Sequence, residues 1–125
     1  MTGGYAVEMN SLEREILWNG YEDRTGLWDA FFVVRDEKPG ARSASEAREL
    51  TRQLIESFVD LGWVEIYSSR GPVGEAVFTR VPKEEQAEVF ASDHSWTWED
   101  GDPLVWYQTT DEGLEAYQGA TSPSS

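Results

Sequence analysis

The apolar positions of residues 43–61 recur every three or four residues, which is the spacing of one face of an α-helix. Ser43 followed by Glu46 has the form of a capping box at its start. Gly62 stands where a left-handed residue would end the helix, because glycine takes that conformation without a Cβ clash. Residues 63–67 then alternate, which predicts a strand directly after the helix. The predicted buried face consists of Ala47, Leu50, Leu54, Phe58 and Leu61.

Two shorter segments precede this helix. Asn10 with Glu13 offers a cap for a first helix that ends near Gly20 and buries Leu12, Ile16 and Leu17.

Residues 27–35, with the sequence LWDAFFVVR, fit either a helix or a buried strand. Their apolar spacing suits a helix, and the run of Phe and Val suits a strand. We favour a helix, because Asp29 and Ala30 are poor strand residues.

A strand and a short acidic helix are predicted after the central unit. Residues 75–81 alternate and follow a turn rich in glycine, proline and serine. Pro82 suits the first turn of a helix, and the glutamates that follow it suit the same end through the helix dipole. We expect this helix to end by Asp93 and to bury Ala87, Phe90 and Ala91.

Residues 95–109 predict a β-hairpin that turns at the glycine of the sequence EDGDP. A register symmetric about this glycine pairs Trp98 with Leu104 and Trp96 with Trp106, which gives one aromatic face. That face has two interpretations: it packs on the central helix as core, which residue preference favours, or part of it stays exposed and anchors a protein partner.

Length and composition indicate one folded domain. The chain has 125 residues with six Trp, five Tyr and five Phe, enough large apolar surface to form a core. Thr109 with Glu112 offers a cap for a last helix. We expect a single domain over residues 1–118 and a disordered tail over 119–125.

Several sites and locations are excluded or disfavoured by the same composition. The chain has no cysteine, so it has no disulfide and no thiolate metal site. The N-terminal residues lack the pattern of a signal peptide, and no apolar run approaches the roughly 20 residues of a membrane helix. We therefore expect a cytoplasmic protein with no membrane partner.

The order of these elements resembles a winged-helix domain. The stretch LIESFVDLGWVEIYSS resembles the third helix and first wing strand of that family, and VWYQTTDEGLEAY is similar to its second wing strand and following helix. The resemblance implies an α+β fold with three N-terminal helices, a small antiparallel sheet or hairpin, a short acidic helix and a C-terminal helix. It assigns no function.

Two departures from that family oppose DNA binding. The DNA-reading helix of the family presents basic and polar residues to the groove. Here Arg52 stands three residues after Glu49 and four before Glu56, and this spacing predicts ion pairs within the helix. In addition, residues 82–93 insert an acidic helix between the two predicted wing strands.

The charge of the chain also opposes DNA binding. Its net charge of −14 opposes binding to phosphate backbones. All ten basic residues lie at or before Lys83, and the segment from Glu84 onward carries acids only. This segment is either a solvated surface or an acidic face for a basic partner.

No stretch indicates a reaction. His94 is the single histidine, and a zinc site would need it joined by acids such as Asp93, Asp100 and Asp102. A loop histidine beside turn acids is the simpler interpretation. The sequence contains no nucleophile elbow, P-loop or dinucleotide glycine pattern. We therefore expect no catalytic residue, no metal and no cofactor.

Our first hypothesis is a non-catalytic cytoplasmic protein-binding module with an acidic C-terminal face. Its partner would be a basic protein, and an inhibitor or immunity-type protein fits this pattern. The candidate partner-binding residues are Glu99, Asp100, Asp102, Trp96 and Trp98.

The alternative is a winged-helix DNA-binding transcriptional regulator. A local patch of arginines can be hidden beneath a negative total charge. The candidate DNA-contacting residues are Arg48, Arg52, Arg70 and Arg80.

Overall fold

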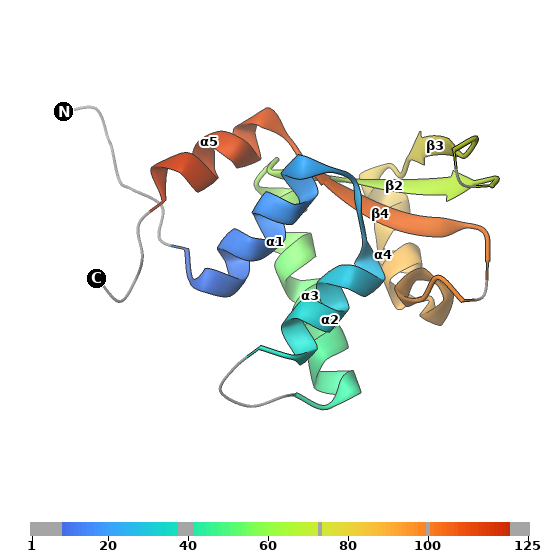
Figure 1. The fold of residues 1–125 in the computed structure, drawn as a ribbon, viewed down its shortest axis with the longest axis horizontal. Coiled ribbons are helices and arrows are strands. Elements are labelled where there is room, and N and C mark those ends of the chain that lie inside the picture. Colours follow the sequence, from blue (N-terminus) through green and yellow to red (C-terminus); the bar gives the residue numbers. More distant parts are fainter. Residues whose placement is uncertain (1–8, 38–41, 73, 100, 121–125) are drawn as a thin grey trace.

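Five α-helices and an antiparallel sheet form an α+β fold in the computed structural model, which describes residues 9–37, 42–72, 74–99 and 101–120 (Figure 1). The helices are α1 (Ser11–Glu22), α2 (Leu27–Arg35), α3 (Ala44–Asp60), α4 (Lys83–Ala91) and α5 (Asp111–Gly119), with a 3-10 helix η1 (Asp93–Trp96). The strands are β1 (Thr25–Gly26), β2 (Val64–Arg70), β3 (Val77–Arg80) and β4 (Leu104–Thr109). The predicted α+β class, with three N-terminal helices, a short acidic helix and a C-terminal helix, is confirmed.

The last strand lies inside the sheet, whose order is β1-β4-β2-β3. β4 pairs with β2 from Val64↔Thr109 to Ser69↔Leu104, and its other edge pairs with β1. β4, from near the end of the chain, therefore lies between β1, which connects α1 to α2, and β2, which follows α3. None of the described helices is long and apolar enough to cross a membrane.

The predicted hairpin over residues 95–109 is wrong. Asp93–Trp96 form η1, and β4 pairs with β2 and β1 instead of with Trp96–Trp98. The reason is burial: Trp96 packs beside Phe90, with ring centroids 6.4 Å apart, and its indole N–H donates to the Phe90 carbonyl oxygen. Trp106 lies opposite Tyr67 in the sheet.

Helix α3 begins and ends as the sequence predicts. The hydroxyl of Ser43 accepts a hydrogen bond from the Glu46 N–H, and Gly62 has a φ of +79°. The buried face, however, is rotated from the predicted one and consists of Ala47, Thr51, Ile55 and Phe58. Leu61 is 54% exposed. Thr51 is buried at no cost in hydrogen bonding, because its hydroxyl donates to the Ala47 carbonyl oxygen at 2.6 Å.

The first two helices agree with the sequence in type. Asn10 and Glu13 form the predicted capping box of α1, and the helix continues past Gly20 to Glu22. Residues 27–35, which fitted helix or strand, form α2.

Helices α4 and α5 differ from the sequence prediction in burial, in the capping residue and in where the last helix ends. In α4, Phe90 is buried as predicted, but Ala87 and Ala91 are exposed. Thr110, and not Thr109, caps α5, because Thr109 belongs to β4 and is buried. Gly119, the first residue of the predicted tail, is the last residue of α5, and residues 121–125 of that tail lie outside the described part of the chain.

The centre of the core is the contact between β4 and α1. The Tyr107 hydroxyl donates to the Ile16 carbonyl oxygen at 2.7 Å, and the Thr109 hydroxyl donates to the Leu17 carbonyl oxygen at 2.6 Å. Both side chains are buried, and Tyr107 has no exposed surface. These two bonds set the position of β4 on α1 through buried polar contacts.

The burial of Tyr107 predicts a loss of stability in alkali. Burial raises the pKa of the Tyr107 phenol above its ordinary value, which the unfolded chain keeps at about 10. The unfolded state therefore loses this proton first, and the free energy of unfolding falls above about pH 10 by up to about 1.4 kcal/mol per pH unit. Urea titrations from about pH 8 to 11 should show a shallower decline for Tyr107→Phe than for the wild type. Parallel pH profiles would contradict this assignment.

Candidate functional site

The structure separates the two tryptophans that the sequence placed in one partner-binding group. Trp96 is 8% exposed and belongs to the core. Trp98 is 48% exposed. Its ring lies 6.3 Å from that of Trp28 and 6.1 Å from that of Phe32, measured between centroids. Trp98 is therefore the more exposed of the two rings.

The predicted acids of the same loop differ in their surroundings. Glu99 is exposed, and its side chain takes part in no ion pair among the described residues. Asp102 is also exposed, but its carboxylate accepts a hydrogen bond from the Gly71 N–H at 2.9 Å and so connects this loop to the turn after β2. Asp100 lies outside the described residues.

His94 takes part in a loop contact: its Nε2 lies 2.8 Å from the Gly101 carbonyl oxygen. Within the described ranges, no group of three His, Asp or Glu side chains is arranged to hold a metal ion.

The acids after Lys83 are exposed throughout the described part of the chain. Among them only Asp93 forms an ion pair, with Arg48. They do not form one face, because α5 packs beside α1, whereas α4 lies at the opposite side of the molecule (Figure 1). There Lys83 of α4 pairs with Asp60 of α3. These exposed acids are Glu84, Glu85, Glu88, Asp93, Glu99, Asp102, Asp111, Glu112 and Glu115.

Most described basic residues are, in contrast, paired with acids. Three of the four predicted DNA-contacting arginines follow this rule: Arg48 pairs with Asp93, Arg52 pairs with Glu49 and Glu56, and Arg80 lies 3.4 Å from Glu65. Arg70 is exposed and forms no ion pair within the described residues. The remaining ion pairs are Arg35–Asp36, Arg42–Glu37, Lys83–Asp60, Arg52–Glu49 and Arg52–Glu56.

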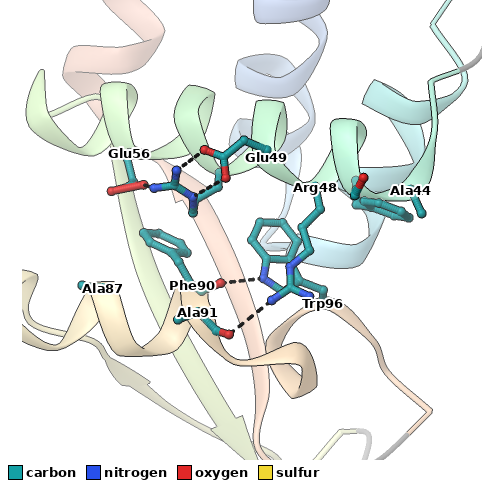
Figure 2. A pocket seen from close by; sticks show the side chains of 11 residues that line it. Ala44, Arg48, Glu49, Glu56, Ala87, Phe90, Ala91 and Trp96 are labelled. Atoms are coloured by element: carbon teal, nitrogen blue, oxygen red, sulfur yellow. Dashed lines mark hydrogen bonds and ion pairs between the residues drawn. The ribbon is translucent and has the colours of Figure 1, made fainter.

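A groove of about 740 Å³ lies between α3 and α4 (Figure 2). We call it the α3–α4 groove. Three aromatic side chains and three alanines give it an apolar surface, and four charged side chains of α3 form one edge. The residues that line it are Phe31, Phe90, Trp96, Ala44, Ala87, Ala91, Ser45, Arg48, Glu49, Arg52 and Glu56.

Arg48 connects the two walls of this groove. Its guanidinium pairs with Asp93, donates to the Ala91 carbonyl oxygen at 3.3 Å, and lies 5.7 Å from the ring centroid of Trp96. At the opposite end of α3, Asp60 pairs with Lys83 at 2.6 Å. Helix α4 is thus held beside α3 by ion pairs at both of its ends.

The charges along the α3 edge are paired with each other, as their spacing predicted. The Arg52 guanidinium bonds the carboxylates of Glu49 and Glu56 (Figure 2). The hydrogen bond from Arg52 lowers the pKa of Glu49, and the bond to Glu49 raises the pKa of Arg52. The groove therefore offers a partner its apolar surface first, and its charges only if these pairs open.

The sequence contains a signal for this groove, although the apolar pattern of α4 predicts core positions there. Ala87 and Ala91 stand four residues apart on one face of α4, and small side chains at that spacing leave room between two helices. Only the position of α4 beside α3 shows that this room stays open.

Comparison with protein-family models, curated proteins and solved structures gives no match for this chain. The candidate sites therefore rest on the geometry and charge of the chain itself.

Proposed function

We propose that this chain is a non-catalytic, cytoplasmic protein-binding module that recognises a basic protein. The observation that carries the proposal is a difference in ion pairing among the described residues. Most arginine and lysine side chains pair with acids, whereas the exposed acids after Lys83, apart from Asp93, pair with no base. Exposed acids without partners create a negative potential, which speeds the encounter with a basic protein and selects its orientation. An inhibitor or immunity-type role toward a basic nucleic-acid-binding protein or nuclease is the specific form of this proposal.

We also propose a winged-helix-like scaffold for the module. Two features support it: β1 lies between α1 and α2 in sequence and pairs with β4, and β2 follows α3 and pairs with the other edge of β4. In this interpretation β2 and β4 are the wing strands, and the segment from β3 to η1 is an insertion between them.

The alternative of a DNA-binding regulator has less support. Arg48, Arg52 and Arg80 would have to leave their acidic partners to reach phosphates. Helix α4, which carries exposed glutamates, lies beside the helix that would read the duplex.

The test is a charge reversal with a matched control. A partner captured on the immobilised protein from a nuclease-treated lysate is titrated against Glu99→Lys and Glu115→Lys, which change the net charge equally. We expect Glu99→Lys, beside exposed Trp98, to weaken binding about tenfold, and Glu115→Lys on α5 to have a much smaller effect.

Two outcomes would count against the proposal. Equal effects of the two reversals would mean that Glu99 is not at the interface. No captured protein, with nucleic acid retained from untreated lysate, would favour the regulator.

A further inference from the structure

We propose that the α3–α4 groove binds the apolar face of a cationic amphipathic helix of a partner protein. This inference rests on the proposed function, because it names the part of a basic partner that would bind and the place where it would lie.

The apolar floor of the groove comes from three separate elements. Phe31 belongs to α2, Phe90 to α4 and Trp96 to η1, and all three line the same hollow. On the α4 wall, Ala87 and Ala91 are exposed and carry no side chain long enough to fill the space (Figure 2). The volume lies in the range of pockets that bind ligands or anchoring side chains.

The walls of the groove favour a helix over an extended peptide. An extended segment gains affinity by pairing its backbone with free N–H and C=O groups at a sheet edge. Here the walls are α3 and α4, whose backbone groups are bonded within each helix away from the ends. A segment that enters the groove must therefore satisfy its own backbone, as a helix does. The small residues Ala87 and Ala91 allow a second helix to approach closely.

The charges around the groove favour a cationic helix. Acids outnumber bases on α3, α4 and η1, and all three bases are already paired with acids. Glu84, Glu85 and Glu88 on α4 are exposed and form no ion pair among the described residues. They flank the groove and do not line it, and Glu85 and Glu88 line a separate hollow. The acids are Glu46, Glu49, Glu56, Asp60, Glu84, Glu85, Glu88 and Asp93, and the bases are Arg48, Arg52 and Lys83. Lysines on either side of an apolar helix face would complement this surface.

The experiment uses two labelled peptides of about 18 residues, five helical turns long. Both contain only leucine and lysine in the same proportion. In one, leucines recur at helical spacing; in the other, the order is scrambled so that no apolar face forms. Fluorescence anisotropy measures their binding to the whole protein, and amide chemical shifts of Ala87 and Ala91 report where the patterned peptide lies.

Two variants test the groove directly. Ala87→Trp fills it, and Gln118→Trp adds the same side chain at an exposed position of α5. We expect the patterned peptide to bind the wild type at least about tenfold more tightly than the scrambled one, Ala87→Trp to lose about tenfold, and Gln118→Trp to bind like the wild type. Ala91→Trp repeats the test if Ala87→Trp does not fold.

The outcomes separate this inference from the proposed function. Equal binding of both peptides, no effect of either groove variant, or shifts confined to other residues would overturn the groove and leave the acidic binding module standing. Binding of neither peptide, even at low salt, would also overturn the groove, whereas the proposed function is decided by the Glu99→Lys titration.

Discussion

Trp96→Ala is expected to lower the free energy of unfolding by about 3–5 kcal/mol, the usual range for a large aromatic side chain lost from a core. The ring is 8% exposed, and its N–H donates to the Phe90 carbonyl oxygen at 2.9 Å in a buried bond. Its removal leaves a cavity below η1 and removes the only side-chain donor that this carbonyl has among the described residues. Urea denaturation followed by circular dichroism measures the effect.

Trp98→Ala is the matched control for this change. The same residue type is removed two positions later, from a ring that is 48% exposed. It contacts Trp28 and Phe32 at its inner edge, so we expect a loss of about 1 kcal/mol. If the two variants lose similar stability, Trp96 is not the core residue described above. Trp98→Ala should weaken a partner at the Glu99 loop without the large loss of stability expected for Trp96→Ala, whose ring also lines the α3–α4 groove.

Gly20→Ala is expected to destabilise the protein by about 1–3 kcal/mol, although alanine is the better helix former by about 1 kcal/mol. A Cβ at Gly20 would lie 2.5 Å from Cε2 of Tyr107 and 2.8 Å from Oγ1 of Thr109. Neither atom can easily move, because both side chains are buried and bonded to α1. The overlap therefore outweighs the gain in helix propensity, and thermal or urea unfolding should show a clear loss.

Gly119→Ala provides the comparison at the end of α5. A Cβ there meets nothing within 4 Å, so the substitution should be neutral or slightly stabilising. A neutral result at Gly20 would mean that α1 and β4 can separate by a few tenths of an ångström without cost, and would contradict a tight contact between them.

The exposed acids and the α3–α4 groove would contribute to partner binding in different ways. Free acids on α4 and in the loop at Glu99 act at a distance and depend on salt. The aromatic floor of the α3–α4 groove acts only on contact and excludes water. A partner that uses both would be steered by charge and held by apolar burial.

Local features of this protein could be predicted from its sequence. The caps at Asn10 and Ser43, the left-handed Gly62 and the ion pairs of Arg52 all join residues three or four positions apart, or depend on a single residue's backbone preference. Interactions at that range are set by helix geometry, so a pattern of residue types is enough to indicate them. The excess of unpaired acids after Lys83 belongs to the same class, because no base is available nearby in the chain.

Only the tertiary structure decided which distant segments meet. Residues 104–109 have strand character, and they could pair either with Trp96–Trp98 or with β2. Burial across the whole fold decides between these partners, and in the structure all six residues pair with β2. The same competition rotated the buried face of α3, placed Trp96 in the core and left Ala87 and Ala91 facing an open groove. Residue preferences are similar for these alternatives, so the choice among them comes from long-range packing that no local pattern contains.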